Sequence, residues 1–136
     1  MPPLFVFEFS YRSDPIISVR VTSRATGIST VTTALIDTGA QRSVFGARVA
    51  RRLGLELVSP AVITLHGIGG SATKGHVHEV DVLLLDESDL SLRLPLAFSE
   101  GDLTAENLIG LDVLSFFDFG VSHANRLGYF GFPSVI

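Results

Sequence analysis

The sequence contains no cysteine. The chain therefore has no disulfide, no thiol nucleophile and no cysteine-bound metal, although this absence does not identify a compartment. No apolar stretch approaches the roughly 18 residues that a membrane-spanning helix needs. The start, Met1-Pro2-Pro3-Leu4, lacks the basic leader and small-residue cleavage site of a signal peptide. We expect no membrane segment in this chain, and a soluble protein that is cytoplasmic or a soluble domain of a longer protein.

Positive charge is also scarce. Ten Lys and Arg residues stand against 14 Asp and Glu residues, which gives a formal net charge of −4 and a pI of about 5.4. Such a chain is not drawn to nucleic acid or to an anionic membrane. We expect no nucleic-acid partner.

The length and composition are those of one folded domain. A chain of 136 residues can bury a real core without disulfides. Because 46% of the residues are hydrophobic and ten are Phe, disorder is not expected. We predict a single domain over residues 1–136.

Apolar and polar residues alternate along much of the chain, which is typical of half-buried strands. Strands are predicted over residues 5–9, 16–21, 29–33, 61–65, 77–85 and 90–96, with a closing hairpin from residues 119–121 and 127–130. The fold class is therefore mostly β.

Two helical segments interrupt this pattern. In residues 46–54, Val49 and Leu53 share a face at four-residue spacing, and Gly54 can end the helix. A short helix is predicted to begin at Asp112, a residue type that suits an N-cap.

The residues around Asp37 form a coherent chemical set. Three apolar residues, Ala34-Leu35-Ile36, lead into Asp37, and Thr38 and Gly39 follow at once. A carboxylate that hydrolyses peptides must sit on a sharp loop, and Gly39 lets a partner approach the backbone closely. The Thr38 hydroxyl can both donate and accept a hydrogen bond. We identify Asp37 as the candidate catalytic residue.

A second element, Leu108-Ile109-Gly110, follows about 70 residues later, a separation on the scale of one domain. Asp37-Thr38-Gly39-Ala40 together with this apolar-apolar-Gly element resembles the retropepsin-like aspartic peptidases, the single-lobed relatives of pepsin. The resemblance spans roughly residues 15–132. It implies an acid-protease half-barrel with one main helix and a flap hairpin. It also implies that the catalytic loop is supported by Thr38, Gly39, Leu108, Ile109 and Gly110.

The segment of residues 66–75 carries four glycines and little to bury, so it is predicted to be the tip of a long, mobile hairpin. The resemblance implies that this hairpin is the flap that closes over a substrate. The implied substrate-binding residues are Gly39, Ala40, Ile68, Gly69 and Gly70.

Two positions depart from the retroviral pattern. Retroviral members carry an Arg after the second glycine, whereas Leu111 stands here, as in retrotransposon-type and bacterial relatives. Retroviral enzymes often place acidic residues after the Ala, where Gln41 and Arg42 stand here. These differences leave the substrate preference open.

Only one Asp-Ser/Thr-Gly occurs in the chain. Aspartic peptidases need two carboxylates that share one proton around an attacking water. The second Asp37 must then come from another molecule, as in a symmetric homodimer. We expect an aspartic endopeptidase that acts on a peptide or protein substrate and needs no metal and no organic cofactor. The alternative is a non-catalytic dimerisation or peptide-binding module with the same fold.

Two further motifs carry no function. Gly67-x-Gly69-x-x-Ala72 follows a strand, but no helix opens after it to hold a pyrophosphate. His76 and His78 share a strand face, yet no carboxylate stands at an obvious ligand spacing, so no metal site is predicted.

The apolar chain ends have two interpretations. Residues 4–7 and 129–132 would interleave between subunits, as the resemblance to retroviral relatives implies, or they would form edge strands packed on their own core.

Overall fold

The computed structural model describes residues 6–57, 61–66, 72–101, 103 and 106–132. Over these ranges the chain forms strands and two short helices, in the order β1 (Val6–Ser10), β2 (Ile16–Ser23), β3 (Ser29–Ile36), β4 (Val44–Phe45), α1 (Ala47–Arg52), β5 (Val62–His66), β6 (Ala72–Leu84), β7 (Ser91–Ser99), β8 (Asn107–Ile109), α2 (Leu111–Leu114), β9 (Asp118–Ser122) and β10 (Leu127–Gly131). The predicted mostly-β class is confirmed.

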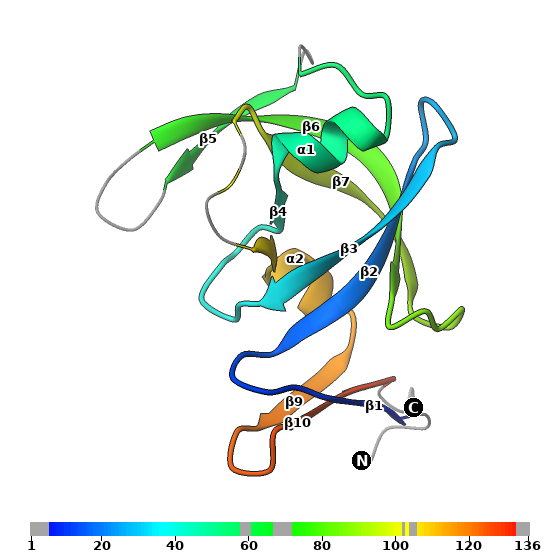
Figure 1. Ribbon diagram of the computed structural model, residues 1–136, viewed down its shortest axis with the longest axis vertical. Helices are drawn as coiled ribbons and strands as arrows, with labels where there is room; N and C mark the ends of the chain where they lie inside the picture. The colour runs from blue at the N-terminus through cyan, green and yellow to red at the C-terminus, as the bar shows by residue number, and fades with distance from the viewer. Residues whose placement is uncertain (1–5, 58–60, 67–71, 102, 104–105, 133–136) are drawn as a thin grey trace.

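Seven strands form one strongly curved sheet in the order β2-β3-β8-β4-β7-β6-β5 (Figure 1). The long strand β6 pairs with β5 through its first residues and with β2 through its last residues. This second pairing brings the far end of the sheet back to β2, so the strands close into a barrel-like layer. Closure of this kind leaves few exposed strand edges.

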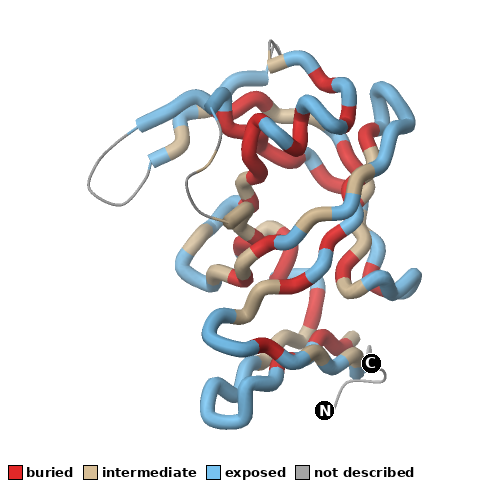
Figure 2. The backbone as a smooth tube through the Cα atoms, viewed as in Figure 1, coloured by how far each residue is buried: buried red, intermediate tan, exposed pale blue. Residues whose placement is uncertain are grey.

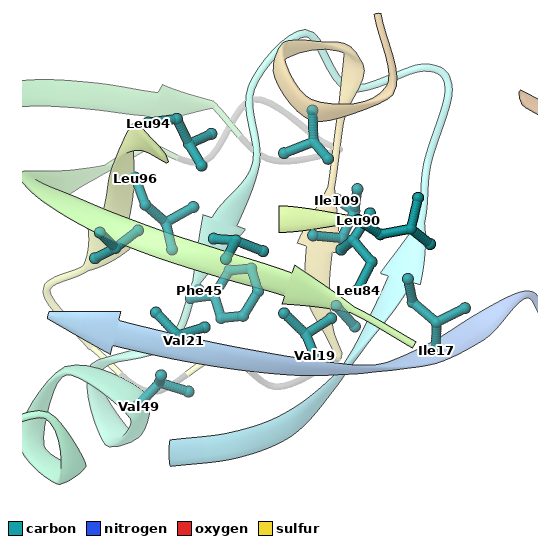
Figure 3. Packing of buried hydrophobic residues seen from close by; sticks show 14 of the residues in the cluster. Ile17, Val19, Val21, Phe45, Val49, Leu84, Leu90, Leu94, Leu96 and Ile109 are labelled. Carbon is teal, nitrogen blue, oxygen red and sulfur yellow. The ribbon is translucent and has the colours of Figure 1, made fainter. Parts of the chain in front are cut away.

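The core lies inside this curved sheet, where buried segments from most of the strands face one another (Figure 2). Residues two apart on β2 (Ile17, Val19 and Val21) point inward, as the period of a strand requires. They meet Leu84 of β6 and Phe45 of β4 in the same cluster (Figure 3). Full burial of such side chains contributes about 1.5–3 kcal/mol each to folding.

Helix α1 confirms the prediction for residues 46–54. Val49, Ala50 and Leu53 are buried, and Gly54 follows with a φ of +71°, a conformation that glycine adopts without strain. Helix α2 forms where the second helix was expected, but its N-cap is Gly110 and not Asp112. The Asp112 carboxylate binds another part of the chain instead, as described below.

The first and last described strands pair with each other. Strand β1 runs antiparallel to β10, and β10 to β9, in a separate three-stranded sheet at the bottom of Figure 1. Its inner face carries Phe130, which is fully buried against Phe117 and Phe119. This face is therefore part of the chain's own core. The outer face leaves Val6, Leu127 and Tyr129 exposed.

The β5–β6 hairpin has longer arms than the sequence predicts. The prediction placed residues 66–75 in the tip, but His66 pairs with Ala72 and Leu65 with Thr73, so residues 72–75 belong to β6. The glycine at 75 fits a strand here because a Cβ would lie 2.9 Å from the Leu65 side chain, which covers it. Ile68, Gly69 and Gly70 lie outside the described residues.

Candidate active site

Asp37 follows directly on β3, and a parallel neighbour fixes its position. Strand β3 pairs with β8 in register Leu35 to Leu108 and Ile36 to Ile109. One residue further on, the Asp37 N–H donates to the Ile109 carbonyl oxygen at 2.9 Å. Segments about 70 residues apart in the sequence thus hold the start of the candidate catalytic loop, which carries Asp37. Asp37 itself is half-buried.

The loop folds back onto the Asp37 carboxylate. Asp37 Oδ1 accepts a hydrogen bond from the Gly39 N–H at 2.9 Å, and the Ala40 N–H donates to the Asp37 carbonyl oxygen at 3.2 Å. An aspartate that accepts from the backbone two residues on stabilises a tight turn. A Cβ at Gly39 would lie 3.2 Å from Oδ1, so a side chain there would crowd the carboxylate.

Gly110 is in contact with the same loop. A Cβ at this position would lie 2.6 Å from the Ala40 carbonyl oxygen and 2.9 Å from the Arg42 carbonyl carbon. The next residue, Leu111, donates its N–H to that Ala40 oxygen at 2.8 Å. Only glycine lets β8 and α2 approach the catalytic loop this closely. The structure thus brings the predicted support residues Leu108, Ile109 and Gly110 against the loop that carries Asp37.

Two side chains to which the sequence analysis gave no role, those of Ser43 and Asn107, complete this support. Ser43 is fully buried, and its hydroxyl donates to Asp112 Oδ1 at 2.6 Å and accepts from the Gly110 N–H at 2.9 Å. The Ser43 N–H also donates to Asp112, at 3.0 Å from each carboxylate oxygen. A hydrogen-bonded network of this kind fixes a single loop geometry because each buried polar group has a partner.

Asn107 ties the loop's far end to the same sheet. Its Oδ1 accepts from the Gly46 N–H at 2.8 Å, and its Nδ2 donates to the Thr33 carbonyl oxygen at 2.9 Å. A weak sequence signal existed for these residues. Ser43 and Asn107 are polar residues immediately beside apolar strand segments, where a buried hydrogen bond is a common reason for a polar side chain.

We predict that Ser43→Ala lowers the free energy of unfolding by about 1–3 kcal/mol, because it leaves the buried Gly110 N–H without its acceptor. Chemical denaturation of the two proteins measures this difference. Ser115→Ala is the matched control, since Ser115 is exposed at the end of α2, and it should change stability by less than about 0.5 kcal/mol. Equal effects of the two substitutions would contradict the role assigned to Ser43.

The structure describes only some of the remaining predicted site residues. Thr38 is exposed and Ala40 is half-buried. The Thr38 hydroxyl makes no hydrogen bond within the described part of the chain. The predicted flap residues Ile68, Gly69 and Gly70 lie outside that part.

Within the described ranges, no group of three His, Asp or Glu side chains is placed to hold a metal ion. Among the same residues, no helix is long and apolar enough to cross a membrane.

The fold is that of retropepsin-like aspartic proteases. EIAV protease in complex with the inhibitor HBY-793 has a TM-score of 0.59 and 18% identity, over 79% of this chain and 90% of its own. The retropepsin-like aspartic protease from Rickettsia conorii has a TM-score of 0.58 and 16% identity, over 94% of this chain and 93% of its own. At such identities the likeness shows the fold.

The sequence itself shows the family. Residues 27–116, more than half of the chain, match the family described as gag-polyprotein putative aspartyl protease, and the chain belongs to this family. No curated protein matches the chain. The resemblance stated from Asp37-Thr38-Gly39-Ala40 and Leu108-Ile109-Gly110 is thereby confirmed at the level of family and fold.

Proposed function

We propose that the protein is an aspartic endopeptidase, active as a homodimer in which two Asp37 carboxylates activate one water. The observation that supports this most directly is the position of Asp37. It lies on a turn held by Ile109 and Gly39, at the end of a strand. One chain supplies one such carboxylate, which is half of the acid and base pair that the chemistry needs.

Asp112, the other carboxylate in the hydrogen-bond network around this loop, is not the second member of the proposed catalytic pair. Asp112 accepts hydrogen bonds from the Ser43 N–H, the Ser43 hydroxyl and the Val113 N–H. These donors hold it against the loop backbone, where it serves the structure. We therefore assign the second catalytic carboxylate to Asp37 of another copy.

In the proposed reaction one Asp37 accepts a proton from the water as general base. Its mate, which holds the shared proton, donates it to the carbonyl oxygen of the scissile peptide bond. Attack by the water's oxygen gives a tetrahedral intermediate, and return of a proton to the departing nitrogen completes hydrolysis. The step requires no metal or organic cofactor.

The other site residues have proposed roles around this centre. Gly39 and Ala40 lie next to the carboxylate and would contact the substrate backbone. Ile68, Gly69 and Gly70 would form the flap over the substrate. The exposed Thr38 hydroxyl has both donor and acceptor capacity for a bond to the partner's loop.

The test is incubation of the protein with a diverse peptide library at several pH values, with cleavage products identified by mass spectrometry. We predict a bell-shaped dependence of rate on pH with an acidic optimum. Two carboxylates that share a proton titrate as a unit, and the rate falls both when the pair holds two protons and when it holds none.

A rate that rises steadily from acid through neutral to alkaline pH would contradict this chemistry. A folded protein that binds peptides or dimerises, but cleaves no library member at any pH, would be the non-catalytic module instead. Thermal unfolding with and without a pepstatin-like inhibitor distinguishes an intact but unproductive site from a missing one, since a ligand of the folded state raises the melting temperature.

A further inference from the structure

A groove of about 490 Å³ opens beside the catalytic loop. It is lined by Gln41 and Arg42, which follow Asp37 in the chain, and by residues 93–95 of β7. Asp112 and Phe116 line the end next to α2. This volume is within the range of clefts that bind small ligands and side chains.

The groove exists because β4 is short. Strand β4 pairs with β7 only at Ala97 and Phe98, and the chain before β4 turns away toward the catalytic loop. At Pro95, therefore, β7 has no neighbour on its β4 side among the strands that the structure describes. Proline suits such a position, since it has no N–H that would need a partner.

Two of the residues that line the groove, Arg42 and Arg93, are cationic. Arg42 is exposed, and no carboxylate lies within 4 Å of its guanidinium in the part of the chain that the structure describes. Arg93 is 60% exposed and is oriented by a bond from its Nε to Asp81 Oδ1 at 3.2 Å. That bond uses one of five N–H donors, so the rest of the Arg93 guanidinium can bind a ligand.

Among the described residues that line the groove, one carboxylate, that of Asp112, stands against the two arginines. Asp112 is bound by Ser43 and Val113 donors, as shown above, and faces the loop backbone. Phe116 is 59% exposed at the α2 end. Its ring offers an apolar surface for the aliphatic part of a long side chain. Two arginines with an adjacent apolar ring favour a glutamate over a neutral or basic residue.

We infer that this groove binds an acidic side chain of the peptide substrate, and that Arg42 is its main determinant. The inference rests on the proposed peptidase function, since it concerns the same substrate. Arg42 is five residues from Asp37, and five residues span at most about 18 Å. An extended peptide rises about 3.3 Å per residue, so the acidic residue lies within about five positions of the scissile bond.

A symmetric homodimer would hold two such grooves, one on each side of the catalytic pair. Favoured substrates should therefore carry acidic residues on both flanks of the scissile bond. The protein's own formal charge of −4 works against acidic peptides in general, so any preference for them must come from a local site.

The test measures binding without cleavage. A library of peptides of about twelve residues, with Glu, Gln or Lys fixed at each position in turn, is incubated with the Asp37→Asn protein. Retained peptides are counted by mass spectrometry. We expect Glu to be retained about fivefold more than Gln at one or more positions, and Lys less than Gln. The preference should shrink at high ionic strength because exposed charges are screened.

Further substitutions in the Asp37→Asn protein identify the residue that causes the preference for Glu over Gln. Arg42→Gln should bring the Glu to Gln ratio close to one, and Arg42→Glu should favour Lys instead. The matched control is Arg52→Gln, which removes an exposed arginine from α1, outside the groove, and should keep the Glu preference. A Glu to Gln ratio of one before substitution, or a preference that survives Arg42→Gln, would overturn the inference.

Failure of the groove assignment and failure of the peptidase assignment give different experimental results. If the wild type cleaves library peptides without regard to Glu, this groove assignment is wrong and the peptidase assignment stands. If Glu is selected through Arg42 but no peptide is cleaved at any pH, the groove assignment stands and the peptidase assignment is wrong. A protein that retains no peptide at all contradicts the groove assignment.

Discussion

Asp37→Asn is expected to reduce peptide cleavage by at least about a thousandfold, because an amide can neither accept the proton of the water nor share one with its mate. The fold should survive. Asn keeps an oxygen at the position of Asp37 Oδ1, so the 2.9 Å hydrogen bond from the Gly39 N–H can still form. We expect the free energy of unfolding to change by less than about 0.5 kcal/mol.

The measurement compares kcat/KM of the two proteins on the best library peptide, with denaturation curves recorded alongside. Asp89→Asn is the matched control, since Asp89 lies on an exposed turn after β6 and should leave the rate unchanged. If Asp37→Asn retained a rate near that of the wild type, the catalytic assignment would be wrong.

The parts of the fold that the sequence predicted are those governed by local rules. Period-two alternation indicated most strands, and the spacing of Val49 and Leu53 indicated α1. The loop that carries Asp37 and its contact with Gly110 could be predicted because both residues belong to short motifs in which each residue type has a structural reason. Gly110 is the clearest case, since a Cβ would meet backbone atoms at 2.6 Å.

The parts that were missed depend on contacts between distant segments. Asp112 stands before the apolar residues Val113 and Leu114, which locally favours an N-cap. In the fold it lies beside Ser43, 69 residues away, and the N–H and hydroxyl of Ser43 both donate to its carboxylate in place of a capping role at its own helix. Local preference is a weak guide wherever tertiary hydrogen bonds compete with it.

The β5–β6 hairpin also shows that local preference is a weak guide, because a strand forms there where a hairpin tip was predicted. Residues 72–75 were predicted to lie in the hairpin tip because the segment of residues 66–75 carries four glycines. Pairing with β5 gives their backbone groups partners and extends β6 to Ala72. Strand formation of this kind depends on the neighbouring strand more than on intrinsic propensity, so a single segment of sequence does not reveal it.

The second prediction with a large expected effect concerns the proposed homodimer. If the active unit contains one Asp37 from each chain, excess Asp37→Asn protein should inhibit the wild type by forming inactive heterodimers. With a threefold excess and free exchange of subunits, only about one quarter of the wild-type chains have a wild-type partner. The rate per wild-type chain should fall to about one quarter. An unrelated protein added at the same concentration should have no effect.

Dilution tests the same point without a variant. Association is a mass-action equilibrium, so the rate per chain should fall once the protein is diluted below its dimer dissociation constant. The single chain offers a surface for such contact, because Thr38 and Gly39 are exposed at the catalytic turn and Gly39 has no side chain to hold a partner away. The outer face of the β1-β10-β9 sheet, with Val6, Leu127 and Tyr129 exposed, is a second candidate surface. A rate per chain that stays constant through dilution and through addition of Asp37→Asn would show an active monomer. In that case the second carboxylate would have to come from the same chain.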